Sequence, residues 1–512
     1  MTTSLRARAA NGLMWSAVQT WSVRLTTALA FIIISRQLTP AEFGLVALSM
    51  SVIAVLTLVG DVGMAAYIVR KPTVSASDSS TAFWTSLALA SALAVLLASS
   101  APLVSKAFDE PEMTHLLWAL SSGLVLVGAA SVPTALLRRE LEFKLLAYRG
   151  MTATLVGSIV AITLALLGAG AWALVGQSLV RGLLSMVFSF TAARWAPSLT
   201  YDRPMAKKML SFGGAVLGID LLNQARDRGE DFVLGSIAGT TSLGYWSVAN
   251  RLVAIIRETG TSVVLSVATP TFARLQHDHK RMVRALDTTL YTSAAVMFPA
   301  MAYLSVLSPD LVPMILGQQW ATTAAAAQLV AITMAIATMS WFDRTIFIAL
   351  DRLKPEIAMV ASFAAIHVVV VVVVVVTGQS LTVLALALLI KGCLSFPIRA
   401  VVLHRVASIP YSVYRRTGRV GCAALIYLAA GEVVTVLLDS GTPLTRVLVG
   451  TALAAGIYPA ALWVVARPVC RSILADLRSL RGRKSAAHAS SSESDRREPK
   501  EDQAPATAGT SS

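Results

Sequence analysis

A series of apolar segments, each long enough to cross a lipid bilayer, constrains this sequence more than any other feature. A transmembrane helix needs about 20 mainly apolar residues. Backbone groups in lipid must form hydrogen bonds within their own segment, so even the valine run from Val368 to Val376 is expected to be helical. By these criteria we predict an all-α integral membrane protein with fourteen transmembrane helices, at 13–35, 45–68, 83–105, 115–137, 147–168, 170–192, 210–238, 243–266, 286–308, 323–350, 356–377, 380–403, 419–438 and 443–466.

The composition agrees with a membrane protein. Only 14% of the residues are charged and 55% are hydrophobic, whereas a soluble domain carries about 25% charged residues. The formal net charge of +15 comes from short basic clusters between the apolar segments, so membrane topology explains it better than a nucleic-acid partner. The three cysteines and six histidines show no metal-ligand spacing, and we expect neither a metal nor a disulfide framework.

The loop charges indicate the orientation of the chain. If the N-terminus is cytoplasmic, basic residues concentrate in the inner loops, and the outer loops hold only Arg36, Lys106 and Arg446. One missed helix would invert this pattern downstream. We therefore predict that both termini are cytoplasmic. The inner-loop residues are Arg70, Lys71, Arg138, Arg139, Lys144, Arg149, Arg194, Arg203, Lys207, Lys208, Arg274, Lys280, Arg281, Arg284, Arg352, Lys354, Arg405, Arg415, Arg416 and Arg419.

A weak internal repeat indicates two halves. LTPAEFGLVALSMSVI (38–53) and AGTTSLGYWSVANRLV (238–253) are 200 residues apart and align Gly44 with Gly244. ALLRRELEF (135–143) and IALDRLKPE (348–356) end the fourth and tenth predicted helices. Parallel repeats with a site between them are a known transporter plan. We predict two six-helix lobes around a central cavity, followed by a helix pair and a disordered basic tail, with boundaries at 1–200, 201–405, 406–466 and 467–512.

The seventh predicted helix is unusually polar. At about 100° per residue, six of its polar side chains fall in one stripe, and two arginines lie at the edges of that stripe. Because both neighbouring segments are apolar and bilayer-length, the stripe is expected to face a protein-lined aqueous cavity, as a transporter requires. The stripe contains Asp220, Asn223, Gln224, Asp227, Glu230 and Asp231, and the arginines are Arg226 and Arg228.

Several segments together resemble a known family. The first half contains NGLMWSAVQTWSVRLTTALAFIIISRQLTPAEFGLVALSM and LVGDVGMAAYIVRK, and the second contains FVLGSIAGTTSLGYWSVANRL, TPTFARLQHD, ILGQQWATTAAAAQLVAI and ALDRLKPE. In order and spacing they are similar to the polysaccharide transporter (Wzx-type oligosaccharide flippase) family of the multidrug/oligosaccharidyl-lipid/polysaccharide (MOP) flippase superfamily. The resemblance covers about residues 5–466. It implies that the chain moves undecaprenyl-pyrophosphate-linked sugar units across the bacterial cytoplasmic membrane.

Such a substrate assigns roles to the candidate residues. Arginine binds phosphate through paired hydrogen bonds, and the candidate arginines are Arg24, Arg226, Arg228, Arg251 and Arg257. The carboxylates and amides of the seventh helix, with Glu258 on the eighth, are candidates for sugar hydroxyls or for a coupling proton or sodium ion. Alternatively, these charges pair with one another to hold helices together; Arg226 and Glu230, for example, are i,i+4.

Other functions stay open at this stage. A cation-coupled multidrug exporter and a flippase for the peptidoglycan precursor lipid belong to the same superfamily. A membrane-embedded polymerase or ligase would need a long outer loop, and no predicted outer loop is long enough. The sequence contains no phosphate-binding GxxxxGK[ST] motif. We therefore expect a transporter without a cofactor rather than an enzyme.

Overall fold

The computed structural model describes residues 2–61, 63–274, 278–350, 352–438, 442–465 and 467, and its described elements are helices. Short 3-10 or π segments connect some of them. The elements in chain order are α1 (Thr2–Gln37), α2 (Pro40–Asp61), α3 (Met64–Arg70), α4 (Ala76–Ala107), α5 (Met113–Arg139), α6 (Phe143–Leu166), α7 (Trp172–Ala193), α8 (Arg203–Val233), η1 (Leu234–Ala238), α9 (Gly239–Arg274), α10 (His279–Leu316), η2 (Gln318–Trp320), α11 (Ala321–Ala337), η3 (Thr338–Ser340), α12 (Asp343–Ala349), α13 (Leu353–Val376), α14 (Leu381–Ala407), α15 (Val413–Leu437) and α16 (Pro443–Val465).

Twelve helical segments among the described residues are long and apolar enough to cross a membrane. Each of the fourteen predicted segments overlaps a helix; the two segments that are not among the twelve lie on α8 and α9, where many side chains lie outside the described ones. Many large apolar side chains on the other helices are exposed, including Leu103, Leu167, Val436 and Leu437. Exposed apolar surface of this extent is stable against lipid chains and not against water. The chain is an all-α, multi-pass membrane protein.

Two predicted helices overlap segments that are long and apolar enough to cross a membrane, but each is interrupted where the prediction had a continuous helix. The helix predicted at 45–68 ends at Asp61, and α3 starts after Gly63, whose φ of 64° lies in the left-handed region that interrupts a helix. The helix predicted at 323–350 changes to a 3-10 turn at Thr338–Ser340 before α12. An apolar run longer than the bilayer requires does not show where its helix bends.

The start of α2 is fixed by its own sequence. Thr39 and Glu42 form a capping box, in which Glu42 Oε2 accepts from Thr39 N at 2.7 Å and Thr39 Oγ1 accepts from Glu42 N at 3.3 Å. Pro40 occupies the first helical position, where its missing N–H costs nothing. A sharp start here sets where α2 begins to cross the membrane.

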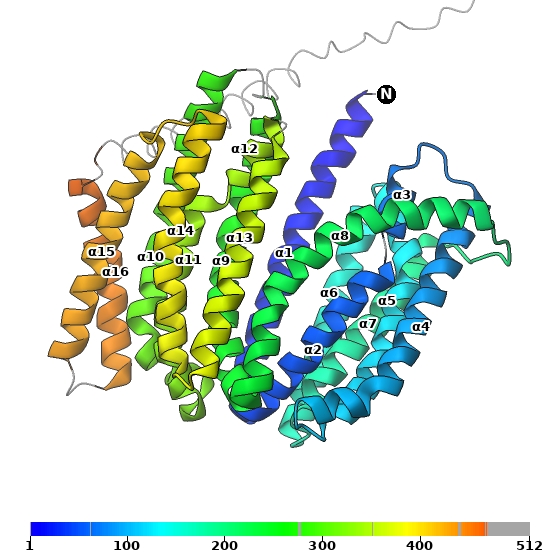
Figure 1. Cartoon of the computed structure of the whole chain (residues 1–512), viewed down its shortest axis with the longest axis horizontal. Helices are drawn as coiled ribbons and strands as arrows, with labels where there is room; N and C mark the ends of the chain where they lie inside the picture. The colour runs from blue at the N-terminus through cyan, green and yellow to red at the C-terminus, as the bar shows by residue number, and fades with distance from the viewer. Residues whose placement is uncertain are drawn as a thin grey trace, which may run out of the picture.

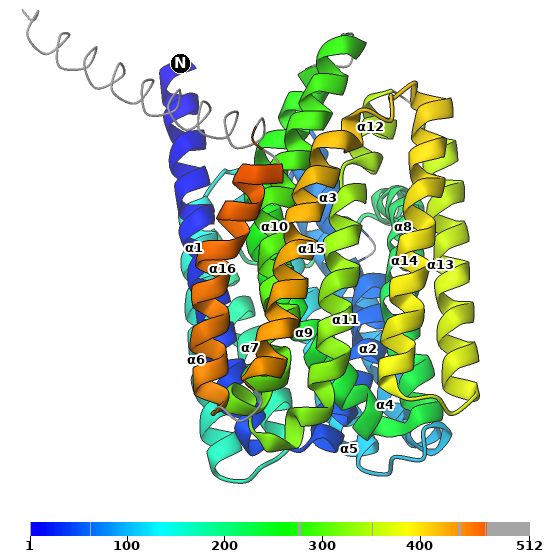
Figure 2. The ribbon, with the colours of Figure 1, turned by 90° about the vertical axis from the view of Figure 1, so that its left-hand side faces the viewer.

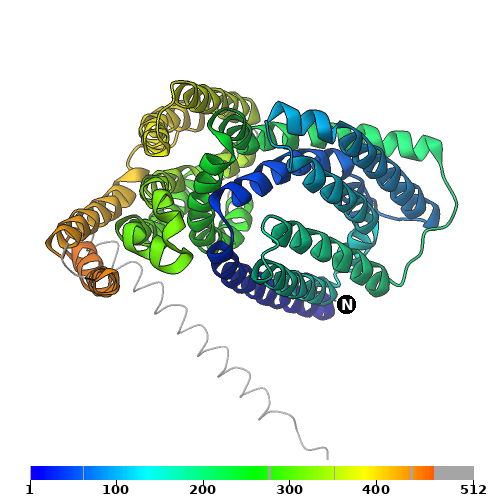
Figure 3. The same ribbon diagram turned by 90° about the horizontal axis from the view of Figure 1, so that it is seen from below.

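The helices form two bundles, which Figure 1 shows side by side. The first bundle contains α1–α7, with α4 against α5, α6 against α7 and α1 against α6. The second contains α9–α14, and Figure 2 shows its helices running nearly parallel. Seen from below in Figure 3, α13 and α14 lie at one edge of the second bundle, apart from the pair α15–α16.

Small residues allow close packing inside the first bundle. Ala90, Ala94, Leu97 and Ala101 of α4 are buried at heptad spacing. A Cβ on Gly128 of α5 would lie 3.2 Å from the carbonyl oxygen of Ser86, so the glycine permits the two backbones to approach. Contacts of this kind stabilise helix pairs in lipid, where no hydrophobic driving force acts between them.

The pair α15–α16 is attached to α10 of the second bundle by two ion pairs. Arg416 lies 3.2 Å from Asp287, and Arg446 lies 3.1 Å from Asp310. The Asp310 side chain is only 7% exposed, whereas Arg416 is 47% exposed. Removing one partner of a buried ion pair leaves an uncompensated buried charge, which is costly. We therefore expect loss of the Arg446–Asp310 pair to destabilise the chain more than loss of the Arg416–Asp287 pair.

Candidate functional site

The two bundles meet where α2 crosses α9, at the lower end of Figure 1. A Cβ on Gly44 would collide with the carbonyl oxygen of Thr240, and a Cβ on Gly244 would collide with the carbonyl oxygen of Pro40. Each helix thus uses a glycine to admit the backbone of the other. We call this end of the molecule the crossing end.

Hydrogen bonds join the bundles at the crossing end. Arg36, at the end of α1, donates from Nε to the Ile315 carbonyl at 2.7 Å and from Nη2 to the Met314 carbonyl at 2.8 Å. Trp320 Nε1 donates to the Ser35 carbonyl at 2.7 Å. These carbonyls lie in the last turns of α1 and α10, where helices leave acceptors without intrahelical partners. The contacts therefore hold α1 against α10 and η2.

An aromatic cluster seals the same end. Phe43 stands edge-on to both Phe31 and Trp320, with ring centroids 6.0 Å and 5.3 Å apart. Tyr245 of α9 contacts Trp320 in the same geometry at 6.1 Å. Edge-to-face pairs are favourable and exclude water. The structure is closed at the crossing end.

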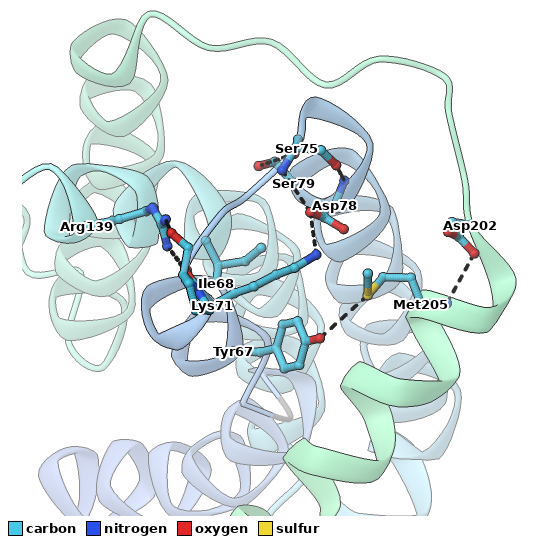
Figure 4. Close-up of polar contacts among 10 residues, drawn as sticks. Tyr67, Ile68, Lys71, Ser75, Asp78, Ser79, Arg139, Asp202 and Met205 are labelled. Atoms are coloured by element: carbon cyan, nitrogen blue, oxygen red, sulfur yellow. Dashed lines mark hydrogen bonds and ion pairs between the residues drawn. The ribbon is translucent and has the colours of Figure 1, made fainter.

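Helix α8 connects the two bundles. Figure 1 shows it running obliquely across the first bundle toward the crossing end. Its N-terminus is anchored to the first bundle: Asp202 caps the helix by accepting from Met205 N at 3.2 Å, and Asp202 N donates to Thr81 at 3.0 Å. Figure 4 shows this anchor and the Tyr67 hydroxyl beside the Met205 sulfur, 3.7 Å away.

The support for this anchor is itself well ordered by polar contacts. Asp78 accepts from Ser75 N in a capping box and from Lys71 Nζ at 2.6 Å (Figure 4). Arg139 of α5 donates to the carbonyls of Ile68 and Lys71 at the end of α3. The carbonyls at the end of α3 thereby gain hydrogen-bond donors. These contacts hold together the part of the first bundle on which the N-terminus of α8 packs.

The other end of α8 contacts both bundles. Asp231 accepts from Ser51 Oγ of α2 at 2.7 Å and forms an ion pair with Arg228 at 3.2 Å. Glu230, the preceding residue, lies 2.8 Å from His367 Nε2 of α13. Lys391 of α14 lies 3.0 Å from the Nδ1 of the same ring. Adjacent carboxylates of α8 thus point to opposite bundles.

The other predicted residues fall into two groups. Gln224, Arg257 and Glu258 are half-buried on α8 and α9, and Arg257 and Glu258 each have an interaction partner. The remaining side chains of the stripe lie outside the described ones, although their backbone is helical; they belong to Asp220, Asn223, Arg226 and Asp227. The central cavity and the binding roles of these residues stay predictions.

Arg24 lies on the side of α1 that is turned away from α6. The opposite side carries Trp15, whose ring centroid is 5.2 Å from that of Tyr148, and Gln19, which contacts Gly150. Nine residues separate Trp15 from Arg24, which is half a turn around the helix. Helix α1 therefore packs on α6 through Trp15 and Gln19.

Two arginines approach each other from different bundles. The charges of Arg181 on α7 and Arg251 on α9 interact, and the Arg181 side chain is exposed. At 1.5 Å per residue, they lie about 14 Å and 18 Å from the starts of their helices. This is near the middle of a hydrocarbon layer about 30 Å thick. Two cations placed there, in reach of solvent, favour an anion between them.

The structure connects to the site three residues that are not among the candidates named from the sequence. Arg181 and Lys391 are isolated cations within apolar segments, and His367 precedes the valine run. The signal that identifies them is an ionisable side chain within a predicted span, which is costly unless it has a partner. Their partners are far away in the sequence, on other helices.

The sequence comparison decides the family. Residues 33–325 match the family model described as polysaccharide biosynthesis protein. The chain belongs to this family, which includes Wzx-type flippases. The resemblance drawn from the sequence is therefore confirmed. Family membership also supports a transporter rather than an enzyme.

Curated members of the polysaccharide biosynthesis family are moderately similar to the chain. The succinoglycan biosynthesis transport protein ExoT of Rhizobium meliloti (strain 1021) is 29% identical over 326 residues, which are 62% of this chain and 66% of ExoT. The lipopolysaccharide biosynthesis protein WzxC of Escherichia coli (strain K12) is 23% identical over 335 residues, which are 64% of this chain and 67% of WzxC. The alignments thus span about two thirds of these relatives.

Solved structures show the same fold. The lipid II flippase MurJ in an inward closed conformation superimposes with a TM-score of 0.72, covering 90% of this chain and 100% of MurJ at 13% identity. An inward-facing multidrug resistance MATE transporter of the MOP superfamily gives a TM-score of 0.56, with 75% and 95% coverage at 16% identity. At these identities the similarity concerns the fold alone.

Proposed function

We propose that the chain is a flippase for an undecaprenyl-pyrophosphate-linked oligosaccharide, which it moves across the bacterial cytoplasmic membrane for surface polysaccharide synthesis. The observation that carries this proposal is the match of residues 33–325 to the polysaccharide biosynthesis protein family. Arg181 of α7 and Arg251 of α9, whose charges interact, come from opposite bundles and suit such a substrate. Like charges repel, so this pair is stable when an anion or water lies between them. A pyrophosphate has the charge and the acceptors that guanidinium groups bind best.

Other predicted residues complete the pathway in this proposal. Arg24 of α1, together with Arg226 and Arg228 of α8 and Arg257 of α9, extends the basic lining for the phosphates. The acids and amides of α8 bind the sugar hydroxyls. The polyprenyl tail stays in the lipid, since it needs no aqueous path.

The conformation fits alternating access. In our proposed topology all fourteen predicted segments cross the membrane, both termini are cytoplasmic, and the crossing end faces outward. The lobes comprise 1–200 and 201–405. The structure then corresponds to a state closed to the outside, which admits a substrate made in the cytoplasm. The lobes then rock so that the contacts of the crossing end separate and the outer side opens.

Genetics tests the function against its two rivals. Deleting the gene from its host should abolish a surface glycan, with lipid-linked repeat units accumulating in the inner leaflet and cell-wall synthesis unchanged. A lysis phenotype with arrested peptidoglycan would point to the precursor-lipid flippase. An intact surface glycan with increased sensitivity to organic cations would point to the drug exporter. Either result would overturn the proposal.

A further inference from the structure

Three ionisable side chains from three helices form one hydrogen-bonded chain within the second half of the molecule. Glu230 of α8, His367 of α13 and Lys391 of α14 are joined at 2.8 Å and 3.0 Å. The Glu230 and His367 side chains are only 15% and 16% exposed. We propose that this chain is a proton-binding site that couples proton uptake to the position of α8.

With Lys391 taken as the ammonium, one arrangement of protons follows. A lysine ammonium has three donors and no acceptor, so His367 Nδ1 must accept from Lys391 Nζ. The ring is then neutral and carries its proton on Nε2, which donates to Glu230 Oε2. The imidazole therefore has its acceptor nitrogen occupied by a hydrogen bond that an incoming proton can replace.

Proton uptake changes both links in a definite direction. The proton forms a bond to Nδ1, which then no longer accepts from the Lys391 ammonium, and the two groups become like charges. The new imidazolium forms an ion pair with the Glu230 carboxylate, which is stronger than the neutral hydrogen bond. Protonation thus tightens α8 on α13 and breaks the hydrogen bond between His367 and α14. Deprotonation of the ring restores the arrangement in the structure.

The Glu230 carboxylate can accept a stronger interaction from His367. Its Oε1 atom is buried, and none of the described residues donates a hydrogen bond to it. A buried carboxylate oxygen without a donor is costly, and a neighbouring imidazolium lowers this cost. Among the described side chains of α8, the charges next to Glu230 are Arg228 and Asp231, which pair with each other, and Asp231 accepts from Ser51 of α2.

Charged groups on the other packed helices are engaged elsewhere or absent. Neither η1, η3 nor α11 contains a titratable side chain. On α12 and α14, Asp343 accepts from Arg399 Nε at 2.8 Å, and Arg344 and Glu356 interact with that pair. Arg399 is eight residues from Lys391, about 12 Å along α14. The charges that α2, α3 and α4 present toward α8 lie near helix ends, at Glu42, Arg70, Asp78 and Lys106.

Histidine suits this task because its unperturbed pKa lies near physiological pH. Release of a proton on one side of the membrane and uptake on the other would bias the rocking of the lobes through α8, which is anchored to the first bundle at Asp202. This role rests on the proposed function, whereas the existence of the proton site does not. The two claims can be tested separately.

Nitrogen NMR tests the site itself. The full chain is labelled at its histidine ring nitrogens and placed in lipid bilayers, and His367→Gln identifies the signal. We expect a neutral ring with Nε2–H at high pH that becomes imidazolium as the pH is lowered. In Lys391→Met the Nε2–H form should lose its preference. A ring that carries Nδ1–H, or that stays neutral throughout, would overturn the proposal. If His367→Gln does not fold, His367→Asn serves for the assignment.

Transport tests the coupling. Proteoliposomes containing a fluorescent polyprenyl-pyrophosphate disaccharide are given opposite pH gradients. For one proton per cycle, a gradient of about one pH unit should change the distribution of the wild-type probe by about tenfold. His367→Gln should lose this response, and the exposed control His115→Gln should keep it. An unchanged response in His367→Gln would refute the coupling. Absence of all transport by the wild type would refute the proposed function, and the NMR result would still decide the site.

Discussion

Gly44 and Gly244 perform the same task for each other's helices. Gly44 admits the Thr240 carbonyl, and Gly244 admits the Pro40 carbonyl. Gly44 and Gly244 are 200 residues apart, as are Pro40 and Thr240, and this is the spacing that aligns the two halves of the sequence. The contact therefore lies on an approximate two-fold axis between the bundles, at the end that separates when the outer side opens.

Replacing either glycine with alanine should disturb this contact between α2 and α9. The new methyl group would meet a backbone carbonyl, which cannot move aside as a flexible side chain can, and overpacking of this kind costs about 1–3 kcal/mol. We expect a lower unfolding temperature and a strong loss of transport for Gly44→Ala and Gly244→Ala. Gly456→Ala on α16 is the control, because a Cβ there meets nothing within 4 Å. Wild-type behaviour of both crossing variants would show that the backbones are not in contact.

Arg36→Ala should open the crossing end. The variant loses two charge-assisted hydrogen bonds to the Met314 and Ile315 carbonyls. A cysteine at Ser35, which is fully buried, reports the change through labelling with a membrane-impermeant maleimide in a background without native cysteines. Labelling from outside should rise about tenfold or more, since hydrogen bonds to charged groups contribute about 1.5–3 kcal/mol. Labelling of Arg36→Lys should be intermediate between the wild type and Arg36→Ala, because a lysine ammonium lacks the planar guanidinium group that donates to two carbonyls at once. Equal labelling in all three proteins would show that the hydrogen bonds of Arg36 do not keep the crossing end closed.

Loss of the Arg446 charge should weaken the docking of α15–α16. Arg446→Met leaves Asp310 as a buried charge without its ion-pair partner, which costs about 3–5 kcal/mol. The matched variant Arg416→Met removes a more exposed pair and should cost about 1 kcal/mol or less. The unfolding temperature in detergent gives the order. The double variant Arg446→Met/Asp310→Leu should recover much of the lost unfolding temperature, because it removes the unpaired charge. If it does not, the loss in Arg446→Met comes from altered side-chain packing and not from the charge of Asp310.

The helices could be predicted because the bilayer sets their length and leaves the backbone no other way to form its hydrogen bonds. The positions at which the helices are interrupted could not be predicted. In the sequence Gly63 is one of several small residues, and only its φ of 64° shows that the helix is interrupted there. Glu230 shows the same limit for the site: spacing proposes a partner one turn away at Arg226, whereas the structure joins Glu230 to His367, 137 residues later in the chain. Only tertiary packing brings such residues together.

The central claim is that basic side chains between the bundles bind the pyrophosphate of a lipid-linked glycan. The most direct measurement is leaflet translocation in proteoliposomes of a polyprenyl-pyrophosphate glycan and of a matched glycolipid without phosphate, by the wild type, Arg181→Ala and Arg251→Ala. We predict transport of the pyrophosphate lipid by the wild type and a loss of about ten- to a hundredfold in each variant, since each charged hydrogen bond contributes about 1.5–3 kcal/mol. Equal rates for the two lipids, or unchanged rates in both variants at equal protein levels, would contradict the account.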